Sequence, residues 1–319
     1  MKIVFLDGYT TQKGDIDDSC LYSLGNYQMY DRTMPDQLEE RAADADILIT
    51  NKFVIDSNSL AHLPNLKYIV VAATGYNNID INAVKDRNIP VSNVVAYSTT
   101  SVVQQAFASL LEVLNKPAYY HDQVRNQRWS SCPDFCFYDH SVRELSDMTL
   151  GIIGFGQIGS KMAAVAQAFG MNVLAYSRTE KTIPNIQFVT NLDQLWSNSD
   201  VISLHLPLSP QSKEMINTAS LMKMKKNAIL INTGRGPLIA EADLANHLKS
   251  HPVFTAILDV LTTEPPSAEN PLVGLSNCHI TPHIAWASAK ARQNLVNGIA
   301  QNITEFLSGS WINRVYEAV

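Results

Sequence analysis

The sequence TLGIIGFGQIG at residues 149–159 decides the fold class of this chain. An apolar run there ends in three glycines spaced G-x-G-x-x-G, and SKMAAVAQAF at 160–169 then places its apolar residues at helical spacing. A strand, a glycine turn and a helix in this order are typical of a dinucleotide-binding unit. An ordinary tight turn is the alternative, because the glycine spacing alone is a weak signal.

Each glycine would have a separate task in such a site. Gly154 would make the tight turn, and Gly156 would let the backbone approach a pyrophosphate. Gly159 would allow close packing of the helix on the strand. Gln157 and Ile158 lie between the second and third glycines, just before the predicted helix, whose N-terminus faces the phosphates in this arrangement.

Length and composition limit the class of protein. The 319 residues suffice for two domains, and 46% hydrophobic with 17% charged residues is ordinary for a globular protein. No apolar run approaches the length of a membrane span, and a net charge of -6 argues against a broad nucleic-acid surface. The opening MKIVFLD predicts a strand and not a signal peptide, so we expect a cytoplasmic protein.

The four cysteines favour free thiols over a metal site. Cys132 and Cys136 are close in sequence, whereas Cys20 and Cys278 stand apart. Without a second pair or a histidine cluster nearby, a zinc site has little support. We expect no bound metal.

Short apolar runs alternate with helical patterns in the first 95 residues. The runs lie at 3–6, 46–50 and 68–72. They are apolar on both faces, which predicts parallel strands with helices between them. Ala73, Thr74 and Gly75 leave the carboxyl end of the last of these strands, where ligands of open α/β sheets bind. Their N–H groups would hold a carboxylate, and a plain turn is the alternative.

A long helix and an aromatic segment follow. Residues 98–115 begin with capping residues and continue at helical spacing, which predicts a helix leaving the first domain. Residues 117–147 contain several aromatics: Tyr119, Tyr120, Trp129, Phe135, Phe137 and Tyr138. This segment is too apolar for a free loop, so it either covers a partner subunit or packs within its own chain.

The alternation of strands and helices resumes after the glycine turn. Strands are predicted at 172–176, 201–206, 228–232, 254–260 and 277–281, and a last helix at 288–308. We expect that helix to return to the first domain. The fold class is therefore α/β, with two parallel-sheet domains, both Rossmann-like or flavodoxin-like, and a cleft between them.

Three charged or titratable residues follow late strands. Arg235, Glu264 and His283 each stand at the edge where a doubly wound domain binds ligands, although each alone also has an ordinary structural explanation. Together they suit hydride transfer to a 2-oxo acid. Arginine binds a carboxylate and carbonyl in a bidentate way, imidazolium donates a proton, and a carboxylate orients the imidazole.

Four motifs in order make the chain resemble the D-2-hydroxyacid dehydrogenase family over its whole length. They are TLGIIGFGQIG, INTGRGPL, DVLTTEPP and TPHIAWAS. The resemblance implies catalytic roles for Arg235, Glu264 and His283. It also implies that Asp259 binds the nicotinamide carboxamide, that Thr233 lies at the cofactor, and that residues 73–75 bind the substrate carboxylate.

The resemblance also implies a domain plan and a partner. The nucleotide domain, residues 99–287, would be inserted into a substrate domain made of 1–98 and 288–319, and the protein would be a homodimer. Within the family the chain is most similar to the glycerate dehydrogenase, or hydroxypyruvate reductase, branch. That branch implies hydroxypyruvate or glyoxylate as substrate, with Trp286 walling the pocket. An aromatic that packs only in the core is the alternative for Trp286.

Two positions depart from the family pattern. Family members that use NAD carry an acid at the end of the second nucleotide strand, where this chain has Ser177 followed by Arg178. Serine removes repulsion toward a 2'-phosphate and Arg178 offers it a cation, so we expect NADP(H) to serve at least as well as NAD(H). A solvated Arg178 beside Glu180 is the alternative. Where many members carry Ala-Glu, this chain has Val103-Gln104, which therefore receives no role.

Two rival functions keep a nucleotide site. A dinucleotide-sensing regulatory protein of the same fold would need no proton donor, so the presence of Arg235, Glu264 and His283 argues against it. A methyltransferase with an adenosyl cofactor has a similar glycine turn. It predicts no oxidation of a reduced nicotinamide by any oxo acid.

Overall fold

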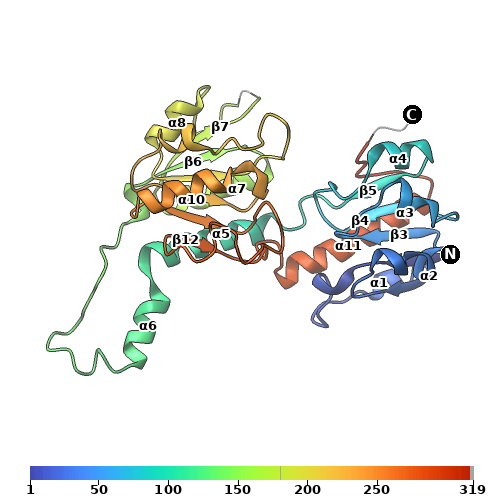
Figure 1. Ribbon diagram of the computed structural model, residues 1–319, viewed down its shortest axis with the longest axis horizontal. Helices are drawn as coiled ribbons and strands as arrows, with labels where there is room; N and C mark the ends of the chain where they lie inside the picture. Colours follow the sequence, from blue (N-terminus) through green and yellow to red (C-terminus); the bar gives the residue numbers. More distant parts are fainter. Residues whose placement is uncertain (180, 317–319) are drawn as a thin grey trace. The chain divides into compact units, whose positions relative to one another are not determined.

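The computed structural model describes residues 1–179 and 181–316 and divides the chain into two compact units. Unit 1 consists of residues 1–98 and 286–319, and unit 2 of residues 99–285 (Figure 1). The chain therefore passes from one unit to the other twice. Glu180, which was weighed as a neighbour of Arg178, lies outside the described residues.

In the described part of unit 1, five strands form a parallel sheet in the order β2-β1-β3-β4-β5. They are β1 (Lys2–Phe5), β2 (Asn26–Met29), β3 (Ile47–Thr50), β4 (Tyr68–Val71) and β5 (Val91–Asn93). The helices of this unit are α1 (Ser19–Tyr22), α2 (Leu38–Ala42), α3 (Ser57–Ala61), α4 (Ile81–Asp86) and α11 (Ala289–Leu307).

Both faces of this sheet are buried, as the doubly apolar runs predict. Alternate residues of one strand enter different cores: Val4 packs in one and Ile3 in the other. Helix α11 covers the second face with its apolar stripe, which includes Leu295 and Ile299. The last helix therefore packs on the first sheet, as the sequence predicts.

Unit 2 contains, in its described residues, a parallel sheet of seven strands in the order β12-β11-β10-β9-β6-β7-β8. They are β6 (Thr149–Ile153), β7 (Asn172–Tyr176), β8 (Gln187–Phe188), β9 (Val201–Leu204), β10 (Ile229–Asn232), β11 (Thr255–Leu258) and β12 (Cys278–Ile280). The strand order reverses between β6 and β9. Open α/β sheets bind ligands at such a switch point.

Helices cover both faces of the second sheet (Figure 1). Buried side chains of α5 (Thr99–Asn115) and α7 (Gln157–Ala168) share one core. Those of α8 (Leu192–Asn198), α9 (Thr218–Leu221) and α10 (Glu241–Ser250) share the other. The predicted fold class, two α/β domains with parallel sheets, is confirmed.

Residues 117–144 form an arm that extends from the sheet of unit 2 (Figure 1). It begins with α6 (Pro117–Arg125), which has no buried residue. Three aromatics of the arm are strongly exposed, namely Trp129 (52%), Phe135 (88%) and Tyr138 (79%). Packing within the chain therefore leaves a large part of the aromatic surface uncovered.

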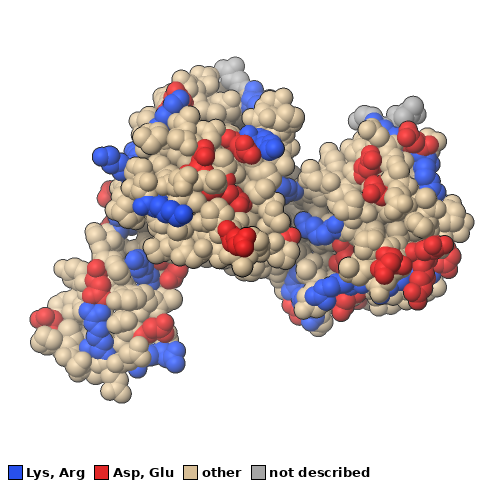
Figure 2. Space-filling view, in the orientation of Figure 1, with Lys and Arg blue, Asp and Glu red and all other residues tan. Residues whose placement is uncertain are grey.

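The surface agrees with the charge of the sequence. On the face shown in Figure 2, basic and acidic side chains are interspersed over unit 2 and form no continuous basic area. No helix in the described part of the chain has both the length and the apolar character needed to cross a membrane.

Candidate active site

The three glycines of the turn have different neighbours. Gly154 has a φ of +95°, and a Cβ there would lie 2.3 Å from the carbonyl oxygen of His205. A Cβ on Gly159 would lie 2.2 Å from the carbonyl oxygen of Gly154. At Gly156, the residue before α7, no described residue lies within 4 Å of such an atom. The turn is therefore closed on the protein side and open at the helix N-terminus, which suits a pyrophosphate.

The residues after β7 carry two cations near this turn. The hydroxyl oxygens of Ser177 and Thr179 lie 3.3 Å apart, and Arg178 is exposed. Lys181, which sequence reasoning missed, donates from Nζ to the carbonyl oxygen of Phe155 at 2.8 Å, within the glycine turn. In the described residues Arg178 has no acidic partner within ion-pair distance.

The Arg235 loop is held by Asn232, a second residue that sequence reasoning missed. Its fully buried side chain accepts from the Gly234 N–H at 3.0 Å and donates to the Arg235 carbonyl at 2.8 Å. The Arg235 guanidinium donates to the Gly234 carbonyl at 2.8 Å. The buried Thr233 hydroxyl has no partner in the described chain, which leaves a polar group for a ligand beside the arginine.

Glu264 and His283 form a pair, as predicted. Nδ1 of His283 lies 2.6 Å from one carboxylate oxygen of Glu264, and the other carboxylate oxygen accepts from the Leu261 N–H at 3.0 Å. This contact fixes the orientation of the ring and leaves Nε2 as the nitrogen on its far side. His283 has a φ of +53°, a left-handed conformation that is uncommon outside glycine and is often found at functional sites.

Asp259 holds the segment that carries His283. Its carboxylate accepts from the Thr281 hydroxyl at 2.5 Å, from the Ile284 N–H at 3.0 Å and from the Ala285 N–H at 2.8 Å. Asp259 is only 3% exposed, and burial raises the pKa of its carboxyl while these bonds lower it. Asp259 therefore fixes the backbone on both sides of the histidine.

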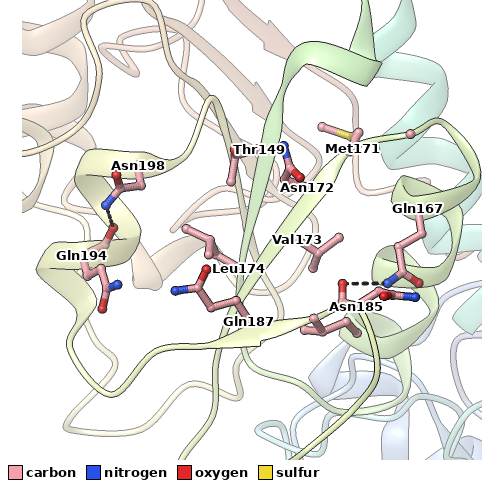
Figure 3. A pocket seen from close by; sticks show the side chains of 12 residues that line it. Thr149, Gln167, Met171, Asn172, Val173, Leu174, Asn185, Gln187, Gln194 and Asn198 are labelled. Carbon is pink, nitrogen blue, oxygen red and sulfur yellow. Dashed lines mark hydrogen bonds between the residues drawn. The ribbon is translucent and has the colours of Figure 1, made fainter.

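The large surface hollow of unit 2 does not coincide with these residues (Figure 3). It lies at the amino ends of β6 and β7, where Thr149 and Asn172 line it. Several side-chain amides surround it, and none of its lining residues is titratable. Ligands of open α/β sheets bind at the opposite, carboxyl edge, so we do not assign the reaction to this hollow.

Comparison with known proteins decides the family. Residues 107–285 match the family model described as D-isomer specific 2-hydroxyacid dehydrogenase, NAD binding domain. A hydroxypyruvate reductase of Blautia hydrogenotrophica is 44% identical over 321 residues, which cover 99% of each chain. The chain belongs to the D-isomer specific 2-hydroxyacid dehydrogenase family.

Two further relatives agree with this family. A glycerate dehydrogenase of Methylorubrum extorquens is 38% identical over 89% of this chain and 90% of its own. The solved structure of an acyclic imino acid reductase in complex with NADPH and D-Arg has a TM-score of 0.85 and 31% identity, over 99% of this chain and 100% of its own. The predicted reaction class, an NAD(P)-dependent oxidoreductase acting on CH–OH groups, is confirmed.

The remaining predicted site residues of this 2-hydroxyacid dehydrogenase belong to unit 1. The Thr74 hydroxyl donates to the Val94 carbonyl at 3.1 Å, and Asn93 donates to the Thr74 carbonyl at 2.6 Å. In the described chain the N–H groups of Thr74 and Gly75 have no hydrogen-bond acceptor, and Ala73 is half-buried. The side chain and the carbonyl of Thr74 therefore hold the loop, while its own N–H group and that of Gly75 stay available to a ligand.

Trp286 is half-buried and packs against a core of unit 1. Its ring lies edge-on to Tyr97, with centroids 6.2 Å apart. One part of the Trp286 side chain therefore packs in the core of unit 1, and another part is accessible.

Proposed function

We propose that this chain reduces hydroxypyruvate to D-glycerate, or glyoxylate to glycolate, with NADPH as the preferred cofactor. The observation that carries this proposal is the Glu264–His283 pair, at 2.6 Å, on the same sheet edge as an open glycine turn. A dinucleotide sensor of the same fold needs the turn but not the pair. The enzymes among the relatives also favour catalysis over sensing.

Arg235 and the 73–75 loop bind the substrate. The Arg235 guanidinium would bind the 2-oxo acid through its planar donor edge and polarise the carbonyl. The N–H groups of Thr74 and Gly75, which have no acceptor in the described chain, would hold the carboxylate together with Ala73.

His283 is the proton donor of this mechanism. With Nδ1 held by Glu264, the imidazolium would give its Nε2 proton to the carbonyl oxygen as negative charge develops there. The Glu264 carboxylate fixes the orientation of the ring through its contact with Nδ1. In the reverse direction the neutral ring would accept the hydroxyl proton.

The cofactor residues fit a dinucleotide. When bound, the nicotinamide supplies the hydride. Gly154, Gly156 and Gly159 shape the turn, while Gln157 and Ile158 present N–H groups of the first turn of α7 to the pyrophosphate. Thr233 and the remaining acceptor capacity of Asp259 would orient the carboxamide.

Three side chains support NADPH over NADH. Ser177 stands where an acid would repel a 2'-phosphate, and Arg178 is exposed beside it. Lys181 adds a second cation, since its ammonium is hydrogen-bonded to the glycine turn. Two cations and no acid among these three residues favour a 2'-phosphate over a 2'-hydroxyl.

Initial rates test the substrate and the cofactor together. Hydroxypyruvate, glyoxylate, pyruvate and phenylpyruvate are each offered with NADPH and with NADH. We expect hydroxypyruvate or glyoxylate with NADPH to have the highest kcat/KM. A clear preference for NADH would contradict the roles of Ser177, Arg178 and Lys181 while leaving the catalytic pair intact. No turnover with any pair would favour the sensing protein.

Replacing His283 by alanine tests the proton donor. We expect kcat to fall by about 10²–10⁴-fold, because general acid catalysis contributes about that much. The Kd for NADPH, measured by fluorescence titration, should stay within twofold. Full turnover in His283→Ala would show that another group donates the proton.

We also propose a homodimer in which a second copy of this chain covers the arm. The exposed Trp129, Phe135 and Tyr138 support it, because monomers rarely expose so many large aromatics on one segment. The cytoplasmic location stays a prediction.

A further inference from the structure

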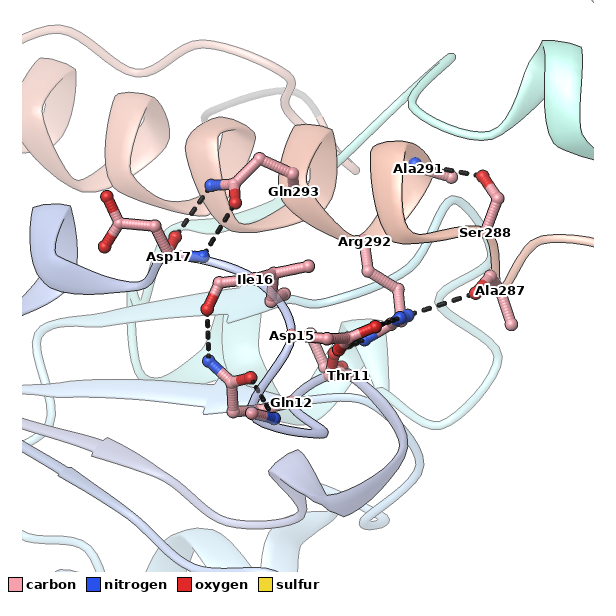
Figure 4. Close-up of polar contacts among 11 residues, drawn as sticks. Thr11, Gln12, Asp15, Ile16, Asp17, Ala287, Ser288, Ala291, Arg292 and Gln293 are labelled. Atoms are coloured by element: carbon pink, nitrogen blue, oxygen red, sulfur yellow. Dashed lines mark hydrogen bonds and ion pairs between the residues drawn. The ribbon is translucent and has the colours of Figure 1, made fainter.

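Arg292 in the first turn of α11 is a buried cation with an unusual number of backbone and side-chain contacts (Figure 4). It is 6% exposed. Its two terminal nitrogens bind the two carboxylate oxygens of Asp15 at 2.7 and 2.5 Å. Nε donates to the Ala287 carbonyl at 3.0 Å, and one terminal nitrogen also donates to the Thr11 carbonyl at 3.2 Å.

These contacts join segments that are distant in sequence. Thr11 and Asp15 lie in the loop that follows β1, at the carboxyl edge of the first sheet. The 73–75 loop follows β4 at the same edge. Ala287 comes directly after Trp286, where the chain returns from unit 2. One guanidinium therefore fixes the backbone next to Trp286 to the ligand edge of the sheet.

A second side chain of α11 holds Tyr97, the residue whose ring packs on Trp286. Asn294 donates to the carbonyl of Tyr97 at 3.3 Å, and the Tyr97 ring lies against Trp286. Tyr97 precedes the point where the chain leaves unit 1. Helix α11 thus holds Trp286 in two ways. Arg292 binds the backbone next to Trp286, and Asn294 holds Tyr97, whose ring packs on Trp286.

Stability alone does not account for an arginine at this position. Burying a guanidinium costs desolvation energy, and the Asp15 side chain that pairs with it is 49% exposed, so the ion pair adds little net stability. Lysine, with one nitrogen, cannot bind a carboxylate in a bidentate way and a carbonyl at the same time. The planar guanidinium of Arg292 therefore joins three segments: the loop after β1, the backbone at Ala287 and helix α11.

We infer that Arg292, oriented by Asp15, is a positioning residue that sets the place of Trp286 in the substrate pocket and thereby the affinity for the 2-oxo acid. This inference rests on the proposed role of Trp286. Arg292 acts through the Ala287 backbone and does not touch substrate.

Gln293, the next residue of α11, offers a matched control. Its side chain donates to the Asp17 carbonyl at 2.7 Å and accepts from the Asp17 N–H at 2.8 Å (Figure 4). It therefore ties the same loop to the same helix, and its side-chain hydrogen bonds go to Asp17 and Asn297 rather than to residues 286–288. Loss of loop anchoring affects both variants, whereas loss of the Ala287 contact affects Arg292→Lys alone.

The test compares Arg292→Lys, Asp15→Asn and Gln293→Ala in the full-length protein. For Arg292→Lys we expect the KM for hydroxypyruvate to rise about tenfold, with kcat and the Kd for NADPH within twofold, because a small displacement of a pocket wall weakens substrate positioning. Asp15→Asn should behave in the same way to a smaller extent. Gln293→Ala should leave KM unchanged, whatever its effect on Tm.

Fluorescence gives a readout that does not depend on turnover. The difference between each protein and its Trp286→Phe derivative isolates the emission of Trp286. We expect this difference spectrum to shift in Arg292→Lys and to stay unchanged in Gln293→Ala. Equal KM values and equal spectra for the two variants would overturn the inference. A wild-type protein that reduces no 2-oxo acid, with a shifted Trp286 spectrum in Arg292→Lys, would overturn the proposed function but not the positioning.

Discussion

The three glycines of the turn differ in the space that a replacing side chain would find around its Cβ atom. At Gly154 and Gly159 a Cβ would lie 2.3 and 2.2 Å from backbone oxygen atoms, so the protein itself requires glycine there. At Gly156 the space is open and the backbone has an ordinary negative φ. None of the residues that the structure describes would lie within 4 Å of a methyl group at Gly156, so its effect would come from contact with a ligand.

Gly156→Ala should therefore separate binding from folding. We expect the Kd for NADPH to rise at least tenfold while Tm changes by less than about 2 °C, because the added methyl group lies in the space of the pyrophosphate. Gly159→Ala serves as the contrast and should lower Tm markedly. Unchanged NADPH binding in Gly156→Ala would show that the dinucleotide does not approach this glycine.

His205 makes stability depend on pH. Burial lowers the pKa of its imidazole from 6.5 to about 4, and its Nε2 lies 2.9 Å from the Ser203 hydroxyl oxygen. Between these pH values the His205 imidazole is protonated in the unfolded chain and neutral in the folded chain. Stability is therefore constant above about pH 6.5 with respect to this group and falls as the pH decreases toward 4.

His205→Gln removes that titration and keeps a hydrogen-bonding group. Over the interval from pH 6.5 to 4 we expect the wild type to lose about 2.5 kcal/mol more unfolding free energy than the variant, since each pKa unit corresponds to about 1.4 kcal/mol and one of the two states is half-titrated at each end of the interval. Urea unfolding at several pH values measures the difference. Parallel curves for the two proteins would exclude His205 as the source.

The chemical type of a residue predicted the candidate site better than its spacing in the sequence did. Arg235, Glu264 and His283 were predicted because each follows an apolar strand and each type suits one task. Asn232 and Lys181 were missed because their importance depends on contacts that spacing does not reveal. Lys181, for example, is 26 residues from Phe155, and only the sheet brings β7 beside β6.

At the level of elements, burial decides which strands are visible in the sequence. The central strands β3, β4 and β9 are buried on every residue and were predicted from apolar runs. The edge strands β2 and β8 were not predicted, because they are short, with polar or exposed positions. Strand β5 (VSN) was missed although it is buried, since its serine and asparagine interrupt the apolar pattern.

In the proposed homodimer the arm lies in the interface between the two copies. Phe135→Asp should convert the protein from dimer to monomer, because it places a charge in a surface that a second copy would bury. Since Phe135 is 88% exposed, the fold of the monomer should not change. Light scattering after size exclusion measures the mass. Val253→Asp, at a residue 63% exposed outside the arm, should remain a dimer.

At the scale of the whole molecule, the two units have separate cores and separate candidate ligand loops. Unit 2 contains the glycine turn and the Glu264–His283 pair, whereas unit 1 contains the 73–75 loop, in which the N–H groups of Thr74 and Gly75 have no acceptor among the described residues. Each loop should therefore respond to its own ligand. The dinucleotide should protect unit 2, and the carboxylate should protect residues 73–75.

Hydrogen exchange of the full-length protein tests this division. NADPH alone should slow exchange in peptides that cover 154–160, because the pyrophosphate would bind the N–H groups at the start of α7. Adding D-glycerate, which cannot react with the reduced cofactor, should then slow exchange in peptides that cover 73–79. Thr74→Ala keeps the N–H group and should retain that protection, since the donors belong to the backbone. If D-glycerate protects no peptide of unit 1, the carboxylate binds elsewhere and the 73–75 loop is the plain turn that the sequence also allows.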